Sequence, residues 1–122
     1  MAGLTNGESQ ATLDARFPTT GATDHIAYSA NGTSETASLA RTPIGATGWS
    51  AATAADPSVK ANANVLTSAA ASGVVTVTHF AIYTAVTAGT QRTDWQALAA
   101  SKALAIGDKL EWAVGAAQVT LT

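Results

Sequence analysis

Residues 74–83 constrain the fold of this chain more than any other segment, because their side chains alternate with a period of two, the period of a β-strand. One face of such a strand carries Val75, Val77, His79, Ala81 and Tyr83. The other face carries Thr76, Thr78, Phe80 and Ile82. We therefore expect a strand here, followed by an alternation of strands and turns up to residue 122.

The segment after residue 83 is divided by turn residues into short apolar pieces. A Gly89 turn leads to a return strand over residues 94–98, and residues 102–106 alternate again. The Gly107-Asp108 pair predicts a turn into a strand over residues 109–114. After a break at Gly115, a last strand is expected over residues 117–122.

Upstream, the pattern is weaker. Asn6 is a candidate cap for a short helix over residues 7–16, whose apolar stripe would consist of Ala11, Leu13 and Phe17. A first strand over residues 25–29 is closed by Asn31-Gly32, which we interpret as a turn rather than a glycosylation site.

Two further upstream segments are ambiguous. Residues 37–44 contain Arg41 and Pro43, so they predict an edge strand or a loop across the sheet. Residues 60–67 fit a strand of mixed exposure, and a helical turn remains open. Asp56-Pro57-Ser58 predicts a turn between these segments.

Short strands at spacings of about eight to twelve residues, with glycine turns between them, are typical of antiparallel sandwiches and barrels. We therefore predict an all-β chain: a single-domain antiparallel β-sandwich or small barrel with a short N-terminal helix. The expected division is an N-terminal arm or helix over residues 1–21 and a β-sandwich domain over residues 22–122.

Composition excludes several classes of function. Alanine makes up about a quarter of the chain, only 11% of residues are charged, and the net charge is -2. The six basic residues are scattered, so no patch for nucleic acid is expected. The sequence has no cysteine and no apolar run long enough for a membrane span. Residues 1–8 have neither the basic nor the apolar region of a signal peptide, so we expect none. A weakly charged surface favours association with other protein.

Residues for catalysis or metal binding do not form a recognisable pattern. Asp24 precedes His25, but neighbours on a strand point to opposite faces and do not form a dyad. The carboxylates are isolated in sequence, and neither a nucleophile elbow nor a calcium loop is present. We therefore expect no catalytic residue, no cofactor and no metal. A small hydrolase using Asp24, Asp56 and Asp94 is the remaining enzymatic alternative.

The large aromatic side chains are the candidate anchors of this alanine-rich chain. We expect them to serve in the core or at an interface, together with one histidine on the long strand. These residues are Trp49, Trp95, Trp112, His79 and Tyr83. The alternative for the three tryptophans is a platform that stacks against sugar rings.

Several segments resemble a family of small virion proteins from phages of actinobacteria, labelled tail-fibre-like, minor tail or capsid decoration proteins. The resemblance rests on residues 75–83, 95–98, 105–110 and 119–121, with weaker likeness at 25–28, 40–41, 49 and 61–62. It covers about residues 22–122. The chain departs from the pattern at Thr84, where the family usually has Asp.

The resemblance implies a non-enzymatic structural protein of a bacteriophage virion. The leading hypothesis is a capsid decoration or cement protein on the outer capsid surface, assembled in the host cytoplasm. Its partners would be the major capsid protein and copies of itself, a trimer being one option, without nucleic acid or membrane. The alternative is a tail-fibre or minor tail protein that binds a host cell-surface glycan or protein.

Overall fold

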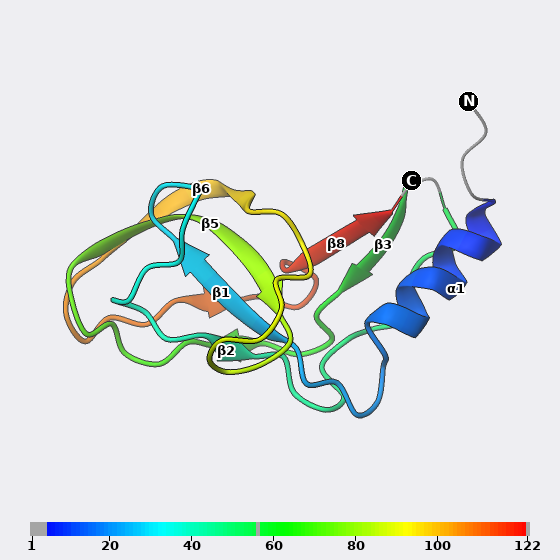
Figure 1. Cartoon of the computed structure of the whole chain (residues 1–122), viewed down its shortest axis with the longest axis horizontal. Coiled ribbons are helices and arrows are strands. Elements are labelled where there is room, and N and C mark those ends of the chain that lie inside the picture. Colours follow the sequence, from blue (N-terminus) through cyan, green and yellow to red (C-terminus); the bar gives the residue numbers. More distant parts are fainter. Residues whose placement is uncertain (1–4, 56, 122) are drawn as a thin grey trace. The chain divides into compact units, whose positions relative to one another are not determined.

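A computed structural model describes residues 5–55 and 57–121 (Figure 1). The predicted all-β class is confirmed, because antiparallel sheets dominate and one short helix accompanies them. The chain divides into two compact units. Unit 1 comprises Met1–Ala22, Ile44–Val65 and Trp112–Thr122, and unit 2 comprises Thr23–Pro43 and Leu66–Glu111. The predicted division into an arm and a sandwich domain stays a prediction.

The helix of unit 1, α1 (Asn6–Arg16), begins one residue earlier than expected. Its cap is Thr5, whose Oγ1 accepts a hydrogen bond of 3.2 Å from the backbone N of Glu8, so the prediction of Asn6 as the cap is wrong. Leu13 and Phe17 are buried as predicted. Ala11 is exposed, so the apolar stripe is narrower than the sequence suggested.

In unit 1, β3 (Ser58–Ala61) pairs antiparallel with β8 (Gln118–Leu121), and α1 packs against β3. The strand predicted over residues 60–67 is confirmed only in part: β3 ends at Ala61, Asn62 forms an isolated bridge with Trp49, and residues 66–67 belong to a separate strand. The buried Asn62 side chain donates to the carbonyls of Asn64 and Ala113 and accepts from the backbone N of Ala117. These bonds replace further sheet pairing. The predicted turn residue Asp56 and the terminal Thr122 lie outside the described residues.

Unit 2 is built on a four-stranded antiparallel sheet of order β2-β1-β5-β6 (Figure 1). The strands β1 (His25–Ser29) and β5 (Val75–Tyr83) lie where the sequence predicted them. The strand β2 (Thr42–Pro43) is an edge strand, the position that tolerates proline. The core contains fully buried side chains from the two central strands: Ile26, Tyr28, Val77 and Ile82.

The strand β6 (Gln96–Leu104) differs from the sequence prediction of two pieces. It is one strand with an irregularity: Val77 pairs with Lys102, whereas His79 pairs with Ala97. Residues 98–101 of β6 therefore have no partner on β5. Such a bulge bends a strand and leaves extra residues out of the ladder, which is why the alternation in sequence is interrupted here.

Two short strands, β4 (Leu66–Thr67) and β7 (Glu111–Trp112), form a further two-stranded sheet. The predicted turn at residues 107–108 is present, because the backbone N of Asp108 donates to the carbonyl of Ala105 at 3.0 Å. The Asp108 Oδ2 accepts from the Ala105 N at 2.9 Å. The strand expected over residues 109–114 is shortened to β7.

Candidate functional site

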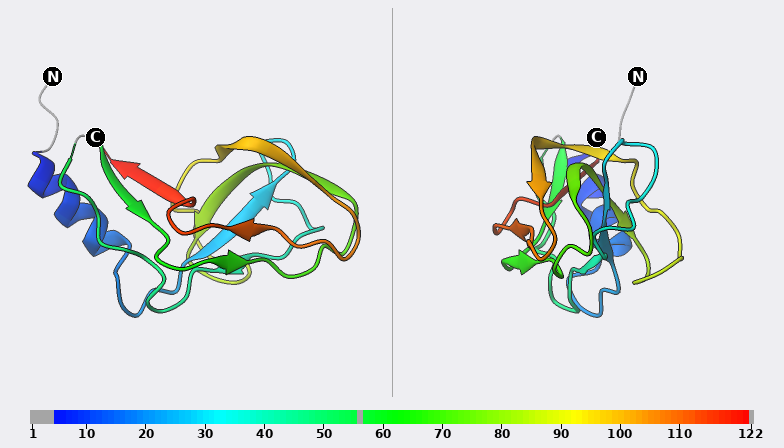
Figure 2. Two further views of the ribbon diagram at one scale, coloured as in Figure 1. Left: turned by 180° about the vertical axis from the view of Figure 1, so that it is seen from behind. Right: turned by 90° about the vertical axis from the view of Figure 1, so that its left-hand side faces the viewer.

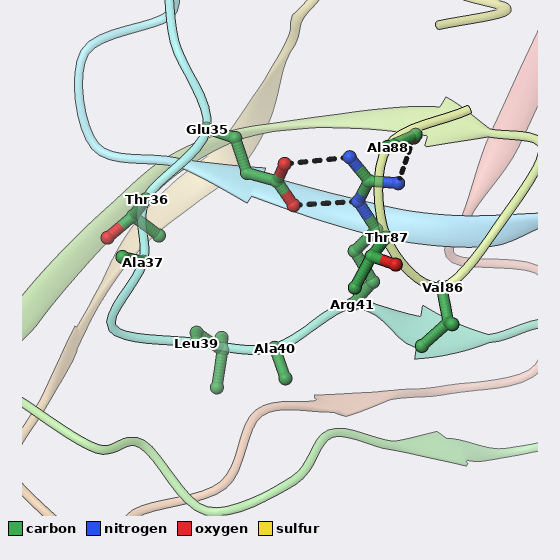
Figure 3. A pocket seen from close by; sticks show the side chains of 9 residues that line it. All are labelled: Glu35, Thr36, Ala37, Leu39, Ala40, Arg41, Val86, Thr87 and Ala88. Atoms are coloured by element: carbon green, nitrogen blue, oxygen red, sulfur yellow. Dashed lines mark hydrogen bonds and ion pairs between the residues drawn. The ribbon is translucent and has the colours of Figure 1, made fainter. Parts of the chain in front are cut away.

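Arg41 is the centre of the most elaborate polar cluster in unit 2. It directly precedes β2 and is buried. Its Nε donates to Oε2 of Glu35 at 2.8 Å and its Nη2 donates to Oε1 of the same carboxylate at 2.8 Å (Figure 3). This two-bond geometry suits the planar guanidinium and is among the stronger charge-assisted contacts in proteins.

The same guanidinium also holds the loop between β5 and β6. Its Nη1 donates to the carbonyl oxygens of Ala85 at 2.8 Å and Ala88 at 2.7 Å. Its Cζ lies 4.0 Å from the ring centroid of Tyr83, a cation–π distance. The hydrogen bond with Glu35 raises the pKa of Arg41 further above its ordinary value. Arg41 therefore remains charged and joins residues 35–41 to the loop.

Residues 84–91, which we call the β5–β6 loop, also have internal support. The backbone N of Thr84 donates to the carbonyl of Thr90 at 3.1 Å, and Oγ1 of Thr84 accepts from the Thr90 N at 2.9 Å. Gly89 has a φ of +73°, and a Cβ there would lie 2.7 Å from the Thr84 Oγ1. Glycine is thus required both by conformation and by space.

An open pocket of about 380 Å³ lies between the β5–β6 loop and residues 35–41. Its walls are small, mostly methyl or hydroxyl groups (Figure 3). The lining residues are Glu35, Thr36, Ala37, Leu39, Ala40, Arg41, Val86, Thr87 and Ala88. The ionisable side chains in this lining, Glu35 and Arg41, form an ion pair with each other. The pocket therefore suits an uncharged group better than an ion.

An aromatic pair lies at the base of the same loop. The ring centroids of Tyr83 and Trp95 are 6.1 Å apart and their planes are inclined by 50°. Both side chains are half-buried, so part of each ring remains accessible. The Tyr83 hydroxyl donates to Oε1 of Gln91 at 3.2 Å, and the exposed carboxylate residue Asp94 precedes Trp95. Accessible rings beside amide and carboxylate groups are suited to binding sugars.

The other two tryptophans are core residues of unit 1. Trp49 is 2% exposed and meets the Phe17 ring edge-on, with centroids 5.5 Å apart and an interplanar angle of 67°. Trp112 is 5% exposed. Neither side chain offers a face to a ligand. Of the tryptophans considered for a sugar platform, Trp95 is the one with an accessible ring.

The two histidines have local partners. His79 is half-buried, and its Nδ1 lies 2.8 Å from the Oγ1 of Thr78. The His79 ring also packs close to the backbone of Gly32. His25 has its Nδ1 2.8 Å from the carbonyl oxygen of Thr23. Both histidine rings thus have contacts within unit 2.

Three carboxylates of the chain form ion pairs. Asp24 is 2% exposed and accepts from Nη1 of Arg92 at 2.9 Å. Asp14 and Glu35 accept from Lys60 and Arg41. The sequence did not indicate these pairs, because their partners are separated along the chain. The one feature of the sequence that could have indicated a buried ion pair was a single charged residue inside an otherwise apolar segment, as at Arg41.

Among the described residues, no group of three or more His, Asp or Glu side chains is placed to hold a metal ion. Within the same residues, no helix has the length and apolar character needed to cross a membrane.

The chain was compared with known protein families. The family model described as Gp80, "Podophage GP4 fiber I protein gp80", matches residues 11–120. No curated protein matches the chain.

Proposed function

The chain belongs to the Podophage GP4 fiber I protein gp80 family, and from this membership we propose that it is a subunit of a bacteriophage fibre that contacts a host cell-surface glycan. The family is one of phage structural fibre proteins and is not a known enzyme class, which supports a structural role in the virion. The proposed contact is the Tyr83–Trp95 pair beside the β5–β6 loop.

The family description favours a fibre over the capsid decoration that was the leading hypothesis from the sequence. The origin in phages of actinobacteria stays a prediction. A fibre subunit needs a stable scaffold and an accessible recognition surface, and loops on a rigid sheet commonly supply the latter.

The observation that carries the glycan proposal is the position of Trp95. Its ring is half-buried against Tyr83, which limits its freedom while leaving surface for a ligand. Arg41 is 4.0 Å from the Tyr83 ring centroid and fixes that ring in turn. Preorganised aromatic side chains bind with a small loss of conformational entropy.

Location is tested by labelling intact phage particles with an antibody against this chain and viewing them by electron microscopy. We expect label on fibres. Label spread over the capsid shell would contradict the fibre proposal and restore the decoration hypothesis.

Glycan contact is tested by screening the purified chain against polysaccharides of the host surface. We expect Trp95→Ala to weaken binding by about tenfold or more, equivalent to about 1.4 kcal/mol, while Trp95→Phe retains most of it. Exposed Val114 in unit 1 provides a control, Val114→Ala, which should bind normally. Equal binding by wild type and Trp95→Ala would contradict the proposed contact.

A further inference from the structure

The strand β6 forms a free edge of the four-stranded sheet of unit 2. It is the last strand in the order β2-β1-β5-β6, so β5 is its neighbour on one side (Figure 2). Most of its residues are exposed, including Ala97 and the run from Ala99 to Ala103. Within the part of the chain that the structure describes, β6 therefore presents an uncovered row of backbone donors and acceptors.

This edge is long, and a single lysine and one bulge are the features that protect it. It has nine residues, whereas strands commonly have about five or six. Natural proteins block such edges with prolines, charges, bulges or a covering segment. The β6 edge contains no proline, and Lys102 is its one charged residue. The bulge at residues 98–101 is its main irregularity.

Two large apolar side chains are exposed at one end of this edge. Val75 pairs with Leu104, so the residues just beyond that pair, Val74 and Ile106, flank the same end of the β5–β6 ladder. Val74 is 79% exposed and Ile106 is 71% exposed. Apolar surface beside an open strand edge favours burial by a partner.

We propose that β6 is a strand-addition site at which a second copy of this chain pairs antiparallel through its own β6. Strand addition uses the backbone row for affinity. The other edges of the described sheets are much shorter: β2 has two residues, and β3 and β8 have four each. Among the described strand edges, only the β6 of a second copy is long enough to pair with all nine residues of β6. Antiparallel pairing of two identical strands gives a dimer with two-fold symmetry.

Charge and side-chain size are compatible with this self-pairing. A two-fold pairing over all nine residues is centred on Ala100 and places Lys102 opposite Leu98 of the second copy, because antiparallel partners are equidistant from the centre. Like charges therefore do not face each other. The central side chains, Ala99, Ala100 and Ser101, are small, which allows close approach of the two strands.

The test is sedimentation equilibrium of the full chain over a wide range of concentration. We expect a monomer–dimer equilibrium, concentration-dependent because a single strand pair buries little area. Ala99→Lys and Ala100→Lys should raise the dissociation constant by about tenfold or more. The matched control is Ala11→Lys on the exposed face of α1, which should associate like wild type.

A second variant and a second measurement distinguish loss of pairing from misfolding of a variant. Ala100→Pro removes an amide donor at a position with no partner on β5, so it should keep the melting temperature and lose the dimer. In wild type, hydrogen exchange of the amides of residues 97–103 should slow as protein concentration rises. The proposal would be overturned by a monomer at every concentration, by a trimer, or by a dimer whose dissociation constant is unchanged in the β6 variants. This result is independent of the outcome for glycan binding at Trp95.

Discussion

The Nζ of Lys60 lies 2.7 Å from Oδ1 of Asp14, an ion pair that joins β3 to α1 across 46 residues of sequence. The two side chains differ in exposure: that of Lys60 is fully buried, whereas that of Asp14 is 37% exposed. The Asp14 Oδ1 also accepts from the backbone N of Ala52 at 2.9 Å. One carboxylate therefore anchors α1 to two segments of unit 1.

The difference in exposure predicts an asymmetric response to mutation. Asp14→Asn leaves the buried Lys60 ammonium without an anion and should lower the free energy of unfolding by about 1–3 kcal/mol. Lys60→Met removes the buried charge and leaves Asp14 able to hydrate, so its cost should be smaller. Urea denaturation of both variants measures the difference. A larger loss in Lys60→Met than in Asp14→Asn would contradict this account.

The same pair predicts a loss of stability in acid. The hydrogen bond from Lys60, followed by that from Ala52, lowers the pKa of Asp14 below its ordinary value of 3.8. The folded state therefore holds this proton less tightly than the unfolded state. The resulting stability is complete above pH 3.8 and is lost as the pH falls through the lower, folded pKa.

This pH dependence is measured by comparing urea midpoints of wild type and Asp14→Asn at several values from neutral to acid pH. The gap between the two proteins should be constant near neutral pH and narrow in acid. A gap that stays constant throughout would show that Asp14 ionisation does not contribute to stability.

Arg41 should not be replaceable by lysine. Arg41→Lys keeps the charge but loses the paired bonds to Glu35 and a bond to the loop carbonyls, so a loss of about 2 kcal/mol is expected. Amides of residues 85–90 should exchange faster with solvent. Glu35→Gln should cost less, because the Glu35 side chain is 30% exposed. Unchanged exchange in Arg41→Lys would argue against its role in holding the β5–β6 loop.

Gly32 is constrained by its conformation and by His79. Its φ is +77°, and a Cβ would lie 2.9 Å from Cε1 of the His79 ring. Gly107 has a φ of +90° with nothing within 4 Å of its Cβ position. Gly107→Ala should cost about 1–2 kcal/mol from backbone strain, and Gly32→Ala should cost more.

A double-mutant cycle separates the two effects at Gly32. Truncation of the ring in Gly32→Ala/His79→Ala should recover the steric part of the loss and leave the backbone part. Additive losses in the thermal denaturation of the double variant would rule out the steric contact.

The tryptophans should divide by their burial. Trp112→Ala should lower the free energy of unfolding by about 3–5 kcal/mol, because it removes a buried ring and leaves a cavity. Trp95→Ala should cost about 0.5–1.5 kcal/mol, the size of its contact with Tyr83. Chemical denaturation of the two variants gives both values, and equal losses would mean that the accessible ring of Trp95 contributes as a core residue.

Local features of the fold could be read from the sequence. The sequence predicts the strand at residues 25–29, a strand over residues 74–83 that is observed at 75–83, and the turn at residues 107–108. A two-residue period and turn chemistry depend on neighbouring residues, so they are expressed in short stretches of sequence. The all-β class follows from these features together.

What the sequence could not determine depends on contacts between distant residues. The strand predicted over residues 60–67 is interrupted at Asn62, because the Asn62 amide has partners at residues 113 and 117. Arg41 and Lys60 are isolated charges in sequence, and only folding brings Glu35 and Asp14 to them. Likewise, Trp95 became the accessible tryptophan because Trp49 and Trp112 are enclosed by the core. Sequence alone thus determined the strands with a clear two-residue period and the turn at residues 107–108. Tertiary structure decided where the other strands end, burial, ion pairing and the open β6 edge, since these arise from long-range packing.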